Sequence, residues 1–348
     1  MFVSKESDAG EVYLSIVVPV YRSEECLIAL YDAIREVMSS IDQTYELILV
    51  NDFSPDKSWS VIQSLCEVDP AVMGIDLRRN FGQDNAIITG LRQVRGKYVA
   101  IMDDDLQHDP KFLPALLSEI EKGPDVVYAD FGAKQQKLWK NIGSWINGKI
   151  AEWVLDKPKG MYISPYKVIR RDIAELICDY PGHAPYIDGL LFQTTARFAQ
   201  VPVEHCSRFQ GKGNFTLVRS VGVSARLAFS FSARPLRLIG ASGVGFAGLG
   251  LALAAFVISY RLFFPQDFGA EAVGWASLMV AILIASGLQM IFFGALAEYT
   301  GRSYLLMSRK PQTAIREVIN GSNIKRIAVA RSPERFFERS AVGSRVDL

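Results

Sequence analysis

The sequence predicts an α/β fold with a mostly parallel sheet, followed by two long apolar segments that form a transmembrane helix hairpin. In the first part of the chain, short apolar runs alternate with segments of helical spacing, which is typical of βαβ crossovers. Two nearly uncharged stretches then follow at 236–263 and 273–297, and each is long enough to cross a bilayer.

Five apolar runs are the expected strands, because parallel strands are buried on both faces and read as continuous apolar segments. In chain order they span 15–21, 45–50, 72–77, 98–102 and 125–128. The helices between them are expected to begin near residues that can cap a helix N-terminus. These starting positions are Ser23, Asp56 or Ser58, Asp84 and Asp109.

Four later segments also have helical patterns. The stretch 135–155 has apolar residues at helical spacing with lysines between them, which fits a helix packed on the sheet or one at a membrane interface. Further helices are expected at 189–196, at 218–233 on the membrane surface, and at 313–319, before a disordered tail.

Composition narrows the function classes. The formal net charge of +1 gives no general attraction to nucleic acid, so no nucleic-acid partner is expected. The four cysteines are scattered without a C-x-x-C pair, which favours free thiols in a reducing cytosol. The N-terminus is polar and carries no apolar core of a signal peptide.

The segment 99–107 carries the strongest functional signal, because its apolar run ends in three carboxylates, Asp103, Asp104 and Asp105. A buried unpaired carboxylate is very costly, so these acids should lie where the strand leaves the sheet, at the edge where open α/β sheets bind ligands. Neighbouring carboxylates repel one another unless a cation joins them, and oxygen ligands favour Mg²⁺ or Mn²⁺. An acidic solvated turn is the alternative.

Polar residues follow the other strands as well, and the carboxyl ends of parallel strands meet at one edge of a sheet. The residues expected to gather there are Pro19, Tyr21, Asp52, Arg79, Asn80, Asp103 and Asp105. The sequence has no G-x-G-x-x-G after the first strand and no G-x-x-x-x-G-K-[ST], so dinucleotide and P-loop sites lose their support. A nucleotide site built on acids and a metal remains.

Four segments carry a resemblance to a known family: 17–21 (VVPVY), 50–54 (VNDFS), 79–83 (RNFGQ) and 102–108 (MDDDLQH). In this order and spacing they resemble family 2 glycosyltransferases. More narrowly, they resemble the membrane-attached polyprenyl-phosphate group that holds dolichol-phosphate mannose synthase and bacterial undecaprenyl-phosphate sugar transferases. The resemblance runs to about Ile319. It implies a Rossmann-like GT-A fold and hexosyl transfer with inversion at the anomeric carbon.

The resemblance also implies roles for individual residues. Asp105 and Gln107 would hold Mg²⁺ or Mn²⁺, and Asp103 and Asp105 would be catalytic. The residues expected to bind the nucleotide sugar are Pro19, Tyr21, Glu25, Asp52, Arg79, Asn80, Gln83 and Asp103. Alternatives remain, because Asp52 could cap a turn and both Asn80 and Gln83 could cap the following helix.

Two regions bear on the acceptor. A hydroxyl acceptor needs a base, and Asp188 is the candidate, although it could equally cap a helix. A phosphate acceptor needs none, because it is already an anion at neutral pH. In the loop 208–217, Arg208 and Lys212 are expected to bind such a phosphate. The chain departs from many relatives at Pro165, where they carry an aspartate.

The predicted organisation has four parts. A cytoplasmic GT-A domain (1–212) leads into a juxtamembrane amphipathic segment (213–235), two transmembrane helices (236–298) and a cytoplasmic basic tail (299–348). Arginines and lysines flank the two spans but are missing from the short loop between them, so the positive-inside rule places both termini in the cytoplasm. The resemblance implies the inner membrane of a bacterium.

The primary interpretation is an inverting transferase that moves a sugar from a UDP-sugar to polyprenyl phosphate, for cell-envelope glycan or glycolipid synthesis. One alternative keeps the fold but uses a hydroxyl of a lipid-linked saccharide, with Asp188 as base. Another is a non-catalytic membrane protein that senses or transports nucleotides. The sequence names no sugar, and both a monomer and a homo-oligomer remain open.

Overall fold

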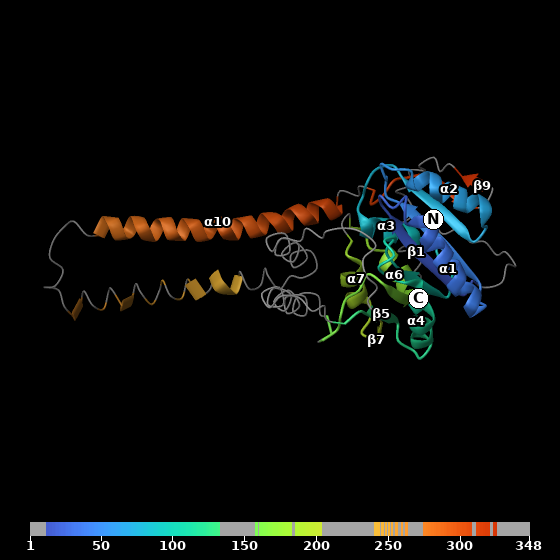
Figure 1. Cartoon of the computed structure of the whole chain (residues 1–348). Coiled ribbons are helices and arrows are strands. Elements are labelled where there is room, and N and C mark those ends of the chain that lie inside the picture. The colour runs from blue at the N-terminus through green and yellow to red at the C-terminus, as the bar shows by residue number, and fades with distance from the viewer. Residues whose placement is uncertain are drawn as a thin grey trace, which may run out of the picture. The chain divides into compact units, whose positions relative to one another are not determined.

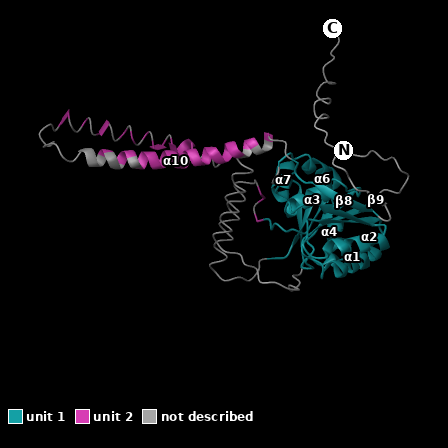
Figure 2. Ribbon diagram, turned by 90° about the horizontal axis from the view of Figure 1, so that it is seen from above, with its two compact units in different colours: residues 1–134, 161–212, 311–348 teal, residues 135–160, 213–310 magenta. Residues whose placement is uncertain are grey.

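The computed structural model describes residues 12–132, 157–158, 160–182, 185–203, 274–307, 311–320 and 323–325, with single positions and short runs between 240 and 263. The chain divides into two compact units (Figure 2). Unit 1 comprises 1–134, 161–212 and 311–348, and unit 2 comprises 135–160 and 213–310.

Unit 1 is built on a mixed sheet, whose described strands lie in the order β7-β5-β6-β4-β1-β2-β3-β8-β9. Figure 1 labels four of them, β7, β5, β1 and β9. The central strands β4, β1, β2 and β3 are parallel, which confirms the prediction for this part of the sheet. The strands span Leu14–Val20 (β1), Tyr45–Asn51 (β2), Val72–Leu77 (β3), Tyr98–Ile101 (β4), Val126–Asp130 (β5), Lys167–Arg170 (β6), Phe198–Pro202 (β7), Ile315–Asn320 (β8) and Asn323–Lys325 (β9).

The helices of unit 1 form two groups. Helix α1 contacts α2 and α4, whereas α6 contacts α3 and α7. Their bounds are Leu27–Ile41 (α1), Ser58–Val68 (α2), Gln83–Leu91 (α3), Leu113–Ile120 (α4), Arg171–Cys178 (α6) and Ile187–Thr194 (α7), with a 3₁₀ turn η1 at Pro110–Phe112. In unit 2, α10 spans Gly274–Met307.

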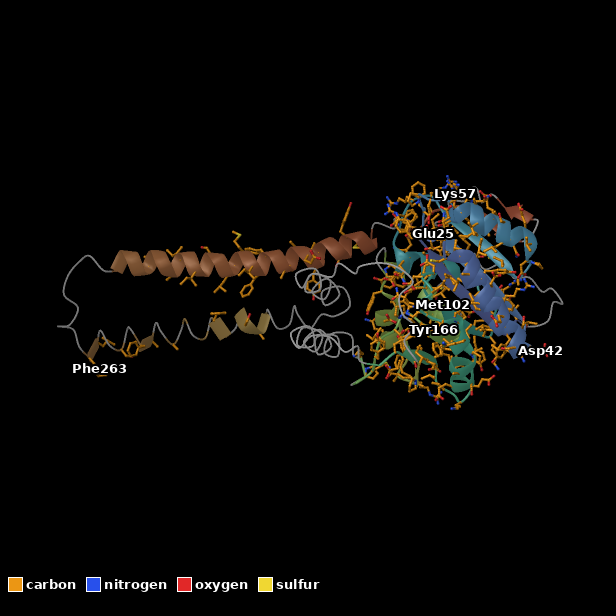
Figure 3. All side chains as sticks on the ribbon, viewed as in Figure 1. Glu25, Asp42, Lys57, Met102, Tyr166 and Phe263 are labelled. Carbon is orange, nitrogen blue, oxygen red and sulfur yellow. The ribbon has the colours of Figure 1, made fainter. Side chains whose placement is uncertain are left out.

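The central strand β1 explains why both groups are needed. Ile16 and Val18 belong to the core cluster that also holds the inward side chains of α1, α2 and α4. Successive residues of a strand point to opposite faces of the sheet, so Val17 lies on the other face, where it is close to Gly90 of α3. Strand β4 is likewise buried, and Met102 (Figure 3) is fully buried directly before the three acids.

Helix α3 lies unusually close to the sheet at Gly90. A Cβ atom added there would come within 2.5 Å of Val17 Cγ1 and 3.1 Å of Val50 Cγ2. We therefore expect Gly90→Ala to lower the free energy of unfolding by about 1–3 kcal/mol, since overpacking forces backbone shifts. Denaturant unfolding measures this, with Ser60→Ala on the exposed face of α2 as control. A gain in stability, as alanine gives in an uncrowded helix, would show that α3 has room to move.

The structure corrects three details of the sequence prediction. Residues 313–319 were expected to be helical, but 315–320 form β8, which pairs antiparallel with β3. Strand β9 follows in what was expected to be a disordered tail. Strand β6, which was not predicted, inserts antiparallel between β4 and β5. For β8 and β6, strands far away in the sequence supply the hydrogen bonds that the local pattern does not reveal, and β9 then pairs with the neighbouring β8.

The expected helices 135–155 and 218–233 lie outside the described residues, as does most of the first apolar stretch, 236–263. The second apolar stretch, 273–297, falls almost entirely within α10. Among the residues that can be described, no helix combines the length and hydropathy of a membrane span. The two-span hairpin and the four-part organisation stay predictions of the sequence.

Candidate active site

A cavity of about 320 Å³ lies at the carboxyl ends of β1, β2 and β4. Its walls come from the loops that follow these strands and from the loop between β3 and α3. The lining residues are Pro19, Val20, Tyr21, Asp52, Asn80, Gly82, Gln83, Asp103, Asp104 and Asp105. The structure thus brings together most of the residues that the sequence proposed for the nucleotide site.

Asp103 is held by the helix beside it. Gln83 Nε2, in the first turn of α3, donates a hydrogen bond to Asp103 Oδ1 at 2.6 Å. Burial, together with the charges of the neighbouring Asp105 and Asp104, raises the pKa of Asp103 to about 7. The three carboxylates therefore carry an electrostatic penalty when ionised, which a cation in the cavity would relieve.

Asp104 has a role that the sequence did not assign. Its Oδ2 accepts a hydrogen bond from the backbone N–H of Tyr21 at 3.1 Å and another from the hydroxyl of Ser23. These bonds fasten the loop after β4 to the loop after β1. Burial raises the pKa of Asp104, and the bonds from Ser23 and Tyr21 oppose the rise. Asp104 thus positions the wall that Tyr21 contributes to the cavity.

Asp105 and Gln107 lie side by side because the loop folds back between them. Leu106 has a φ of 57°, in the left-handed region. The Gln107 N–H donates to Asp105 Oδ1 at 3.1 Å, and the Gln107 side chain donates to Asp105 Oδ2. Within the described part of the chain, no three His, Cys, Asp or Glu side chains are grouped as ligands of one metal ion. A Mg²⁺ site commonly uses only one or two carboxylates, with substrate phosphates and waters.

Asp52 binds the protein backbone. Its Oδ1 accepts from the Phe81 N–H at 2.7 Å, and its Oδ2 accepts from the Gly82 N–H at 2.8 Å. Burial raises the pKa of Asp52, and these two bonds oppose the rise. Asp52 thereby fixes the loop that leads into α3, where Gly82 has a φ of 91°. These bonds join Asp52 to a distant loop and not to the turn that directly follows it, which was the capping role considered from the sequence. The expected contact with a nucleotide base stays a prediction.

Three non-glycine residues around the cavity have left-handed backbone conformations. Arg22, Phe53 and Leu106 have φ values of 59°, 57° and 57°, and they follow β1, β2 and β4, respectively. Such conformations cost on the order of 1–3 kcal/mol each and gather at functional sites when the surroundings hold them in place. The loops that line the cavity are therefore held in strained conformations.

Several predicted site residues lie elsewhere. Glu25 (Figure 3) is exposed and does not line the cavity. The Arg79 guanidinium lies 4.6 Å from the centre of the Phe81 ring, also outside the lining. Arg208 and Lys212 are outside the described residues. Their roles stay predictions.

Asp188 belongs to a buried polar cluster beside the cavity. Its Oδ1 accepts a hydrogen bond from the Tyr128 hydroxyl at 2.9 Å and an ion pair from Lys167 Nζ. The Lys167 side chain is only 4% exposed, and Lys167 pairs with Ile101 in the sheet, two residues before Asp103. Asp84 lies nearby, where burial and the charge of Asp188 together raise its pKa to about 6. Sequence reasoning assigned no site role to Lys167, which begins the unpredicted β6, and considered Asp84 only as the start of a helix.

Comparisons with known proteins find similarity over most of the chain. Residues 15–177 match the family model described as glycosyl transferase family 2. The chain is 29% identical over 314 residues to an undecaprenyl-phosphate 4-deoxy-4-formamido-L-arabinose transferase from Shewanella sediminis, covering 90% of this chain and 94% of the relative. It is also 29% identical over 307 residues to a Yersinia pestis protein of that name, covering 88% and 93% of the two chains.

Among solved structures, the chain resembles glucosyl-3-phosphoglycerate synthase from Mycobacterium tuberculosis in complex with UDP. The TM-score is 0.46 at 16% identity, over 63% of this chain and 79% of that one. A second structure of that enzyme, in complex with Mn²⁺, UDP-glucose and phosphoglyceric acid, has a TM-score of 0.46 at 16% identity, over 63% and 78% of the two chains.

Proposed function

We propose that this chain, a member of the family 2 glycosyltransferases, moves a sugar from a nucleotide sugar to a polyprenyl phosphate. The proposed donor is a UDP-sugar. The observation that carries the proposal is the convergence of Asp103, Asp104 and Asp105 with Asp52 and Gln83 in one cavity. Similarity over about nine tenths of the chain to transferases named for undecaprenyl phosphate supports the acceptor class. The sensing or transport alternative finds no support in these relatives.

The cavity fits a divalent cation by the chemistry of its donors. Asp105 would hold Mg²⁺ or Mn²⁺ with Gln107 beside it, and oxygen ligands of this kind suit both ions. When bound, such an ion neutralises the charge that develops on a leaving diphosphate. Asp103 would contact the nucleotide sugar, and the bond from Gln83 keeps its carboxylate oriented toward the cavity.

A phosphate acceptor is favoured over a hydroxyl acceptor by the surroundings of Asp188. The same oxygen of Asp188 accepts from the Tyr128 hydroxyl and from the Lys167 ammonium, so it is engaged in structural contacts. A phosphate acceptor is already an anion and needs no base. We propose that Arg208 and Lys212 bind this phosphate and that Asp188 takes no proton. The hydroxyl alternative, with Asp188 as base, is the second candidate.

We further propose that the protein is an integral membrane protein attached through 236–297, with the catalytic unit and both termini in the cytoplasm. Charge asymmetry around the two apolar stretches supports this orientation. Apolar side chains of α10 also lie more than half exposed: Leu278, Ile282, Ile284, Met290, Ile291, Phe293 and Leu296. A lipid environment would cover such a surface.

The test is to incubate membranes that contain the protein with polyprenyl phosphate and a panel of nucleotide sugars. We expect one nucleotide sugar to release free nucleoside diphosphate and to form a glycosylated lipid, and only when polyprenyl phosphate is present. Transfer that requires a lipid-linked saccharide would support the hydroxyl alternative. No product with any donor, from protein that is folded, would contradict the proposed function.

A further inference from the structure

A polar network crosses the edge of the sheet at four neighbouring strands, β8, β3, β2 and β1. Arg316 Nε, on β8, forms an ion pair with Asp76 Oδ2 on β3. Asn51, the last residue of β2, donates from Nδ2 to Asp76 Oδ1 at 2.7 Å. The Ser54 N–H donates to Asn51 Oδ1 at 3.2 Å, and the Arg22 N–H donates to Ser54 Oγ at 3.2 Å. The network therefore joins the C-terminal part of unit 1 to two loops of the cavity.

Asp76 is the buried centre of this network. Asp76 is fully buried, and a buried carboxylate requires an opposite charge and hydrogen bonds. Burial raises the pKa of Asp76, whereas the bond from Asn51 and the charge of Arg316 oppose the rise. The only cation that forms an ion pair with Asp76 among the described residues is Arg316, whose own side chain is 46% exposed. Arg316 thus supplies the countercharge from the solvent side.

Asn51 transmits the contact because its amide can donate and accept at the same time. The Nδ2 group donates to Asp76, while Oδ1 accepts from Ser54. An aspartate at position 51 could not donate, and it would place a second carboxylate against Asp76. The two bonds also fix both ends of the turn 51–54, which contains the cavity residue Asp52 and the strained Phe53.

The same C-terminal segment reaches a second wall of the cavity. The Arg78 N–H donates to the carbonyl oxygen of Ala314 at 2.8 Å, just before the loop that holds Asn80 and Gly82. The hydroxyl of Thr89 on α3 lies within hydrogen-bond distance of the hydroxyl of Thr313, at 3.0 Å. Residues 313–316 therefore contact both the loop and the helix that together carry Asn80, Gly82 and Gln83 of the cavity lining.

We propose that Arg316 is a positioning residue for the nucleotide pocket, which sets the turn 51–54 through Asp76 and Asn51. The β8 segment, which follows the apolar part of the chain, thereby controls how well the pocket binds its ligand. This inference rests on the proposed function only in taking a nucleotide sugar as that ligand.

The first measurement needs no ligand. Amide hydrogen exchange of the full-length protein is compared between wild type, Arg316→Met and Asn51→Asp. We expect exchange of the 52–54 and 80–82 amides to become about tenfold faster in both variants, because local opening follows the lost contacts. Arg197→Met, which removes an exposed arginine between α7 and β7, is the matched control and should leave these amides unchanged.

The second measurement is kinetic. We expect Arg316→Met to raise the KM for the nucleotide sugar about tenfold, with a smaller change in kcat and in the KM for the lipid. The double variant Asn51→Asp/Asp76→Asn exchanges donor and acceptor, so it keeps the hydrogen bond between positions 51 and 76 and the bond from the Ser54 N–H, but it replaces the Arg316–Asp76 ion pair by a contact with a neutral amide. We expect it to restore part of the slow exchange and of the KM that Asn51→Asp loses.

The outcomes separate the two proposals. Unchanged exchange of the 52–54 amides in Arg316→Met, or a double variant no better than Asn51→Asp, would overturn the positioning role. A uniform loss of protection across the sheet with an unchanged KM would show that Arg316 only stabilises the fold, and it would also overturn the positioning role. Absence of transfer by the wild type would contradict the proposed function alone, because the exchange experiment would still decide the role of Arg316.

Discussion

Replacing Asp105 by asparagine is expected to lower the rate of sugar transfer by roughly a hundredfold to a thousandfold, while the free energy of unfolding stays nearly unchanged. Asp105 lies on the loop after β4, and its described hydrogen bonds come from Gln107, two residues away. The domain therefore gains little stability from this carboxylate. The cavity, in contrast, loses the charge that best fits a divalent cation opposite a diphosphate.

The measurement is transfer at a series of Mg²⁺ and Mn²⁺ concentrations, together with denaturant unfolding. The control is Asp109→Asn, which changes an acid of the same loop that caps the following 3₁₀ turn through the Lys111 N–H at 2.9 Å. We expect the control to keep its rate and its metal requirement. Full turnover of the wild type in excess chelator would show that no divalent cation is used.

The second large effect is expected at the buried ion pair beside the cavity. Replacing Lys167 by methionine should lower the free energy of unfolding by about 3–5 kcal/mol, because it leaves the Asp188 carboxylate without its cation in a buried site. The double variant Lys167→Met/Asp188→Asn removes both charges and should regain a large part of the loss. Denaturant unfolding of the four proteins in this cycle gives the coupling free energy directly.

The pH dependence of this cluster has a defined sign. The raised pKa of Asp84, about 6, means that ionisation disfavours the folded state. Its penalty is absent below the ordinary pKa of an aspartate near 4 and complete above about pH 6. Removing the Lys167 cation should enlarge this penalty, so Lys167→Met should lose more stability at pH 8 than at pH 5. An equal loss at both values would argue against an electrostatic cause.

The same double variant separates two roles of Asp188. If Asp188 only pairs with Lys167, transfer should recover together with stability when both charges are removed. If Asp188 takes a proton from a hydroxyl acceptor, the double variant should fold well and remain inactive. A stable, inactive double variant would therefore support the hydroxyl alternative over the phosphate acceptor.

The central sheet could be predicted from sequence because its strands are continuous apolar runs separated by helical segments. For this reason the sequence predicted the strand that precedes Met102 and the position of the three acids directly after it. Strand β6 was missed because only its two middle residues, Val168 and Ile169, are apolar, and its buried first residue is a lysine. Strand β8 was mistaken for a helix because its pattern is short and its partner, β3, lies far away in the chain.

The sequence identified the residue types of the site, but it did not identify the groups with which these residues form hydrogen bonds and ion pairs. The sequence indicated that Asp52 is important without revealing that both of its oxygens bind the backbone at Phe81 and Gly82. The role of Asp104 and the Lys167–Asp188 pair depend on contacts between distant segments, which one sequence does not contain. The local motif therefore predicted the chemistry of the cavity, and the tertiary structure determines how it is held.

The pairing of β8 with β3 has a consequence for biosynthesis. During synthesis, the edge of β3 and the Asp76 carboxylate stay without their partners until β8 and Arg316 leave the ribosome, after the long apolar stretches. Nascent chains that stop early expose an open strand edge and an uncompensated acid, both of which favour aggregation and degradation. For the same reason, a shortened enzyme for crystallisation should not simply end at residue 212. It should keep 311–325, joined by a flexible linker in place of the apolar part.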